Sequence, residues 1–153
     1  MGNLSPSLAK RGKGRFVFHL NSLFIPEKLL SELISHCKEA YPFEACGILA
    51  GKGNVVRKLY RMTNIEKSGF SYLMDPKEQF SVMKELRAQG LEMTAIYHSH
   101  PASDAFPSPK DIDLAFYEDS FYVIASLVRE EPLVKAFEVR NGSVREVEIA
   151  VNS

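Results

Sequence analysis

The chain has 153 residues, of which 45% are hydrophobic and 25% charged, and this composition argues against a disordered chain and against a membrane protein. Its length predicts a single domain that buries its own core. Basic and acidic residues number 19 each, but four of the basic residues precede residue 16, so the remainder is mildly acidic and nucleic acid is not an expected partner.

The first fifteen residues are rich in Gly, Ser, Lys and Arg and lack the apolar stretch of a secretory signal. We expect residues 1–15 to form a flexible tail and residues 16–153 to form the domain. The two cysteines, Cys37 and Cys46, are too few for a disulfide framework. A reducing, cytoplasmic location is therefore the simpler expectation.

Apolar runs and turn residues divide the first half of the chain. A strand is predicted at 16–20, and the 3.6-residue apolar spacing predicts a helix from Pro26 to Ala40. The compact apolar run at 44–51 is expected to be a strand buried on both faces. A more polar strand at 55–62 and a short strand at 70–74 follow.

The second half contains two helix starts. Asp75 and Ser108 each stand as a cap before a proline, which predicts helices from Pro76 to Gly90 and from Pro109 to about Tyr117. Four more strands are predicted, the last two joined by the hairpin dipeptide Asn-Gly: 91–98, 121–128, 134–140 and 143–151. The chain is thus expected to be an α/β protein, a mixed β-sheet flanked by helices.

Two histidines stand at the end of the predicted strand at 91–98, His98 as its last residue and His100 just beyond it. His98 and His100 stand two residues apart, so their imidazoles leave the same face of a strand. Asp111 is the third residue of the helix that Ser108 caps, and a cap of this kind can also fix a metal-binding carboxylate. Two imidazoles, one carboxylate and a water form the ligand set of hydrolytic zinc centres. Asp113 is the rival third ligand, but it points roughly 200° away from Asp111 on a helix.

A hydrolytic water also needs a base. Glu44 stands directly before a buried strand, where a carboxylate is costly unless it has a partner. The plainer interpretation is a glutamate that faces solvent at a strand end, and Glu39 is a competing carboxylate at the end of a helix. Cys46 is a candidate nucleophile of a rival chemistry, but no basic residue nearby favours its thiolate, so we expect it to be structural.

The combined pattern resembles a family signature. The run Glu44-Ala45-Cys46-Gly47-Ile48-Leu49-Ala50-Gly51, then His98-Ser99-His100-Pro101, six residues, and Ser108-x-x-Asp111 is similar to the signature of the JAMM (MPN-plus, Mov34/PAD-1) metalloproteases. The similarity spans about residues 16–151. It implies a fold like that of the cytidine deaminases, in agreement with the mixed sheet and three helices predicted above.

The resemblance also implies a role for each residue of the signature. His98, His100 and Asp111 would bind Zn²⁺, one ion per chain, and Glu44 would take a proton from the water and pass it to the leaving amine. Ser108 would donate a hydrogen bond to the oxyanion. The implied activity is that of a zinc metallopeptidase.

Short family members without insertions resemble free-standing prokaryotic peptidases that act on the C-terminus of ubiquitin-like sulfur carriers. Only six residues separate Pro101 from Ser108, which leaves little room for the loops that hold ubiquitin in eukaryotic relatives. We therefore expect hydrolysis of an amide bond after a Gly-Gly-type tail that pairs with a sheet edge, and no membrane partner.

Two alternatives come from other functional classes. A non-catalytic MPN-type scaffold or ubiquitin-like-protein-binding module would be expected to lack some of the ligands, and a zinc deaminase would need a Cys-x-x-Cys pair, which this sequence does not contain. The carrier, the released group and the oligomeric state stay open, and a homodimer is compatible with the sequence. Five aromatic residues either line a groove or pack in the core: Tyr41, Phe43, Phe106, Phe116 and Tyr117.

Overall fold

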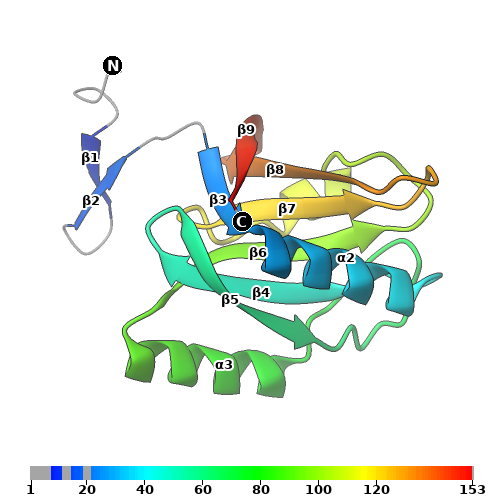
Figure 1. Ribbon diagram of the computed structural model, residues 1–153, viewed down its shortest axis with the longest axis horizontal. Helices are drawn as coiled ribbons and strands as arrows, with labels where there is room; N and C mark the ends of the chain where they lie inside the picture. The colour runs from blue at the N-terminus through cyan, green and yellow to red at the C-terminus, as the bar shows by residue number, and fades with distance from the viewer. Residues whose placement is uncertain (1–7, 12–14, 19–21, 153) are drawn as a thin grey trace.

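The computed structural model describes residues 8–11, 15–18 and 22–152 (Figure 1). Strands β1 (Leu8–Arg11) and β2 (Arg15–Phe18) pair in an antiparallel sheet of their own, and β2 covers the start of the strand predicted at 16–20. The predicted tail, residues 1–15, lies mostly outside the described residues. The boundary between tail and domain therefore stays a prediction.

The other seven strands form one mixed sheet that closes into a barrel in the order β3-β5-β4-β6-β7-β8-β9. Neighbouring strands are antiparallel except for the pairs β3–β5, β3–β9 and β6–β7, which are parallel. The predicted α/β class with a mixed sheet is confirmed. The strands are β3 (Ser22–Pro26), β4 (Cys46–Lys52), β5 (Val55–Met62), β6 (Glu92–His100), β7 (Phe121–Ser126), β8 (Leu133–Arg140) and β9 (Ser143–Asn152).

Strand β3, which the sequence prediction lacks, closes the sheet by pairing with both β5 and β9. Buried and half-buried residues alternate along β3, with Leu23 and Ile25 as the buried ones. Five residues directly before a helix are too short a run for this period to be recognised in the sequence. The predicted hairpin is present, with positive φ at both Asn141 and Gly142.

Within the described residues three helices accompany the sheet, as predicted: α2 (Glu27–Ala40), α3 (Pro76–Gln89) and α4 (Pro109–Asp113). The last is shorter than predicted: the helical hydrogen bonds stop after Leu114, since the Ala115 N–H donates to Ile112 O and the Tyr117 N–H donates to the hydroxyl of Tyr122 at 3.0 Å. Within the described ranges, none of the helices has the length and apolar character needed to cross a membrane.

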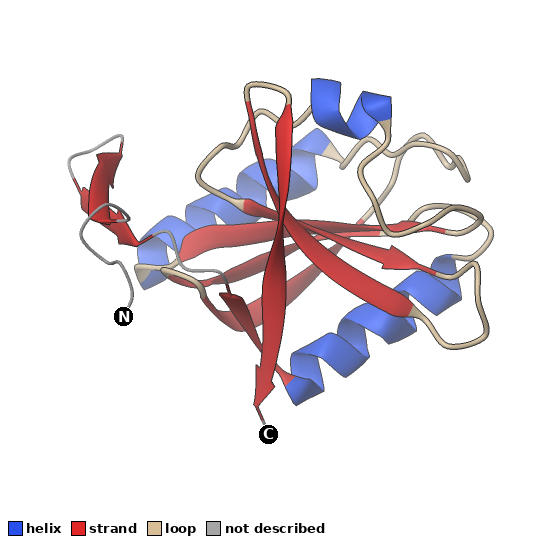
Figure 2. Cartoon of the chain, turned by 90° about the horizontal axis from the view of Figure 1, so that it is seen from above, coloured by secondary structure: helices blue, strands red, loops and turns tan. Residues whose placement is uncertain are grey.

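The strands bury both of their faces. Ala95 and Tyr97 of β6 pack in the same cluster as Leu33 of α2, whereas Ile96 packs in the cluster that contains Leu86 of α3. Figure 2 shows the two long helices on opposite sides of the strands. Because side chains alternate along a strand, His98 and His100 belong to the face of Ile96.

The opposite face of β6 fixes this strand on β4 and α2. Tyr97 stands opposite Gly47, where a β-carbon would overlap the tyrosine ring, and its hydroxyl lies 2.6 Å from Nδ1 of His36. Ser99 Oγ accepts the backbone N–H of Ala45 at 2.8 Å, and the Ser99 N–H donates to the Ala45 carbonyl. These contacts hold the residues that alternate with the two histidines.

Candidate active site

Three side chains meet where β6 ends and α4 begins. Nε2 of His98 lies 3.1 Å from Oδ2 of Asp111, Nε2 of His100 lies 3.0 Å from the same oxygen, and the two nitrogens are 3.2 Å apart. A tetrahedral zinc ion with bonds of about 2.0–2.1 Å needs ligand atoms about 3.3 Å apart. The three residues therefore fit a zinc ion, whereas Asp113 is exposed and lies outside this group.

The start of α4 holds the carboxylate in place. The Ser108 N–H donates to Oδ2 of Asp111 at 2.9 Å, and the Asp111 N–H donates to Ser108 Oγ at 3.0 Å. This is the predicted capping box, and it shares its carboxylate oxygen with the two imidazoles. Burial opposes ionisation, but the hydrogen bonds from His100, His98 and Ser108 keep the pKa of Asp111 well below its usual range. The carboxylate is thus charged, as a metal ligand must be.

The two histidines are supported differently. His100 donates from Nδ1 to the Asp104 carbonyl at 2.8 Å, so once Nε2 gives up the proton that it donates to Asp111, its lone pair faces the cluster. The ring of His98 stacks on Tyr72 with centroids 4.7 Å apart, and its Nδ1 is buried without a hydrogen-bond partner among the described residues. Burial lowers the pKa of His98, which favours the neutral form that binds metals.

Glu44 lies on the same face as the histidines. Cys46 pairs with His98, so the antiparallel register, continued by two residues, places Glu44 opposite His100. Its backbone is tied to the loop after β5, because the Glu44 N–H donates to Ser68 O at 2.8 Å and the Glu44 carbonyl accepts from Asn64 at 3.1 Å.

The Glu44 side chain is only 4% exposed, and its Oε1 has no hydrogen-bond partner within the described part of the chain. Burial raises the pKa of Glu44 to about 8, against the influence of His100. A buried carboxyl group that titrates near neutrality suits proton transfer. The solvent-facing interpretation of Glu44 is therefore wrong, whereas the competitor Glu39 forms an exposed ion pair with Arg61 at 2.8 Å.

Cys46 has none of the features of a nucleophile. Both cysteines are free and buried, and burial raises the pKa of Cys46 to about 12. The expectation that Cys46 is structural is confirmed. Tyr72, Ser99 and Asp104, which contact the histidines or fix their strand, were not predicted from the sequence. Only Ser99 could have been found locally, because it stands between the two histidines.

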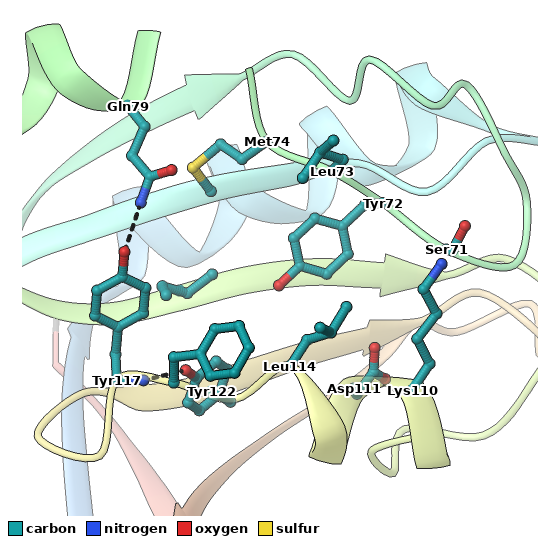
Figure 3. Close-up of a pocket in the computed structure, with 12 residues that line it drawn as sticks. Ser71, Tyr72, Leu73, Met74, Gln79, Lys110, Asp111, Leu114, Tyr117 and Tyr122 are labelled. Atoms are coloured by element: carbon teal, nitrogen blue, oxygen red, sulfur yellow. Dashed lines mark hydrogen bonds between the residues drawn. The ribbon is translucent and has the colours of Figure 1, made fainter. Parts of the chain in front are cut away.

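A cavity of about 210 Å³ opens beside Asp111 (Figure 3). Ser71–Met74 forms one wall and Leu114–Tyr117 contributes to the other, and Gln79 of α3 donates to the Tyr117 hydroxyl at 3.0 Å. Ser71–Met74, predicted as part of a strand, forms only the isolated bridge between Asn64 and Met74. The cavity is lined mainly by apolar and aromatic side chains.

The five aromatic residues singled out in the sequence are each at least 41% exposed, so the core-packing alternative is wrong. Phe116 and Tyr117 line the cavity beside Asp111, and Phe106 lines a second cavity. For these three residues the groove interpretation is therefore the one that agrees with the structure.

Known proteins match this chain over most of its length. The sequence model of the family described as prokaryotic homologs of the JAB domain matches residues 26–140. A CysO-cysteine peptidase of Mycobacterium tuberculosis is 34% identical and covers 84% of this chain and 90% of its own. A probable TtuB-protein conjugate cleaving protease of Thermus thermophilus is also 34% identical, over 71% of this chain and 74% of its own. The solution structure of a Desulfitobacterium hafniense protein, 35% identical, superposes with a TM-score of 0.78 over 86% of this chain and 93% of its own.

Proposed function

This chain belongs to the family of prokaryotic homologues of the JAB domain, and we propose that it is a zinc-dependent peptidase that hydrolyses an amide bond at the C-terminus of a ubiquitin-like sulfur-carrier protein. The observation that carries the proposal is the cluster of His98, His100 and Asp111 beside the buried carboxyl group of Glu44, whose Oε1 has no hydrogen-bond partner among the described residues. The peptidase and protease activities in the names of two relatives support the same reaction class.

In the proposed mechanism, His98, His100 and Asp111 would hold one zinc ion per chain. A zinc ion there would supply a Lewis acid and would lower the pKa of a water to about 7. Glu44 accepts a proton from the attacking water and returns it to the leaving amine. Ser108 Oγ already accepts the Asp111 N–H, so its own proton is available for donation to the carbonyl oxygen of the scissile bond.

We place the Gly-Gly-type tail of the carrier in the cavity beside Asp111. Leu73 donates to the Asn64 side chain and accepts from the Ile65 N–H. Because backbone groups alternate along an extended segment, those of Tyr72 face the other edge and are able to pair with a peptide. A tail without side chains passes between the aromatic walls most easily. The free, buried cysteines agree with a cytoplasmic location.

The experiment that tests the proposal measures both the zinc content and the cleavage activity of each variant. Protein purified without chelator is analysed by elemental mass spectrometry, and a ubiquitin-like carrier with a C-terminal extension is followed by intact mass. We expect about one zinc ion per chain and release of the extension, and loss of both in His100→Ala, which removes one ligand of the triangle. His36→Ala, on the α2 side of the sheet, is the matched histidine control. Wild-type protein that stays free of metal after zinc addition and dialysis would favour the non-catalytic scaffold or binding module.

A further inference from the structure

A second cavity, of about 280 Å³, shares no lining residue with the first. One wall is the loop that follows His100, and the other is the loop between β7 and β8 together with the start of β8. Its lining consists of Asp104, Ala105, Phe106, Ser126, Val128, Arg129, Glu131, Leu133 and Lys135.

This cavity adjoins His100, one of the candidate zinc ligands. The Asp104 carbonyl that accepts from Nδ1 of His100 belongs to its wall. Ser126 pairs with His100 in the parallel register of β6 and β7, and the Leu127 N–H donates to the His100 carbonyl at 3.1 Å. Ser126 Oγ donates to Ser103 O at 2.6 Å and ties the two walls together. Both walls thus leave the carboxyl ends of adjacent parallel strands, where α/β proteins commonly bind ligands.

The two cavities differ in charge. The one beside Asp111 has one cation, Lys110, and one anion, Asp111, among mainly apolar residues. The second cavity is lined by two cationic residues, Arg129 and Lys135, and two acidic residues, Asp104 and Glu131. Nζ of Lys135 lies 3.9 Å from Glu146, which is a long ion pair between side chains that are 38% and 54% exposed. Such a pair is weak, so the ammonium group is able to bind another anion.

The two sides of the scissile amide bond differ in charge in the same way as the residues needed to bind them. An uncharged tail occupies the acyl side, and an amino acid leaves from the amine side with a negative α-carboxylate. Arginine and lysine bind carboxylates through charge-assisted hydrogen bonds. A cavity of this size holds one or two amino-acid residues but excludes a folded domain.

We propose that the second cavity is the leaving-group subsite and that it selects a single amino acid or a very short peptide, whose α-carboxylate is bound by Arg129 and Lys135. This inference rests on the proposed function. The bond that breaks joins the carrier's terminal carbonyl carbon to the α-nitrogen of the leaving residue. Water adds its hydroxyl group to the carbonyl carbon and its proton to the nitrogen, so no other reactant is required.

The test compares two substrates that differ only in charge. One carrier is extended by alanine with a free carboxylate and the other by alaninamide, so that only the α-carboxylate distinguishes them. Hydrogen bonds to charged groups contribute about 1.5–3 kcal/mol, so we expect the zinc-loaded enzyme to favour the carboxylate substrate by about 10–100-fold in kcat/KM. Arg129→Gln and Lys135→Gln should each reduce this preference, because each should slow alanine release more than alaninamide release. Lys38→Gln, an exposed cation on α2, should change neither rate.

Equal rates on both substrates would overturn the subsite and leave the proposed function intact. If neither substrate were cleaved, the proposed function would fail, and amide NMR would decide the subsite independently. Free alanine titrated into the protein should then shift the amide signals of Leu127 and Leu133 and those between them, whereas alaninamide should not. Absence of these shifts would refute the subsite as well.

Discussion

The two faces of β6 differ in how their buried polar atoms are hydrogen-bonded, and the difference is visible within the four residues from Tyr97 to His100. On the α2 side, Tyr97 and Ser99 have their polar atoms hydrogen-bonded, the first to His36 and the second to Ala45. On the other side, His98 keeps a buried nitrogen without a partner among the described residues, as Glu44 keeps a buried oxygen. Strand alternation therefore separates the hydrogen-bonded groups of one face from the groups of the other face that are proposed to bind metal and to transfer a proton.

The largest effect should come from Asp111→Ala, which alters the candidate metal site on the histidine face of β6. The substitution removes the oxygen that lies within 3.1 Å of both imidazoles, so zinc and all measurable hydrolysis should be lost. The fold should persist, because α4 is only five residues long. Zinc stoichiometry and turnover are measured beside Asp113→Ala, which should retain both. Unchanged zinc in Asp111→Ala would transfer the ligand role to Asp113 or to another residue.

Glu44→Gln should keep zinc and lose turnover. Replacing a positioned acid/base of this kind typically costs about 10²–10⁴ in rate. Steady-state kinetics on the zinc-loaded variant measure the loss, and Glu39→Gln, which alters an exposed carboxylate on α2, is the matched control. Wild-type turnover in Glu44→Gln would remove Glu44 as the base.

The same substitution should change how the stability of the metal-free protein depends on pH. Burial raises the pKa of Glu44 from 4.5 to about 8, so the folded state binds this proton more tightly than the unfolded state does. The stabilisation is complete below pH 4.5 and is lost as the pH rises through about 8, over a range of a few kcal/mol. Urea unfolding from pH 5 to 8 should show wild type losing stability relative to Glu44→Gln. A constant difference would contradict the shifted pKa.

Gly47→Ala, opposite Tyr97 on the α2 side of the sheet, should lower the free energy of unfolding rather than the rate of hydrolysis. Its β-carbon would overlap the ring of Tyr97, and overpacking of a core costs about 1–3 kcal/mol or more. Urea denaturation measures the loss. The cost should shrink in a Tyr97→Leu background, because the overlapping ring is absent there. An equal cost in both backgrounds would show that another contact requires the glycine.

The smallest effect is expected for Tyr97→Phe. It removes the hydroxyl that lies 2.6 Å from His36, and the loss of one such hydrogen bond costs about 1 kcal/mol. Zinc content and turnover should stay at the wild-type level, although the residue is adjacent to His98 in the chain. A loss of turnover comparable to that of Glu44→Gln would show that the two faces are not independent.

The features that the sequence predicted are the local ones. The shared face of His98 and His100 follows from strand alternation, and the capping box of Ser108 and Asp111 follows from four consecutive residues. The roles of these residues in metal binding and catalysis stay predictions. The stack of Tyr72 on His98 joins positions 26 residues apart and depends on how the loop after β5 folds back, which no local rule gives.

The same limit applies to the fold. Closure of the sheet depends on β3 pairing with β9, two segments from opposite ends of the chain. The chain that follows α4 donates the Tyr117 N–H to the hydroxyl of Tyr122, a residue of the following strand. Helix and strand periods were sufficient for the class of the fold and for most of its elements, but they carry no information on such partners.

The parallel pairing of β6 with β7 has a consequence for evolution and engineering. The register that sets His100 beside Ser126 is fixed within the sheet, while the chain from residue 127 to 132 lies outside it. If the loop lines the proposed subsite, insertions or exchanges in it should change which product is recognised without moving the histidines. Variation confined to these six residues would then offer a route to new substrates on an unchanged scaffold.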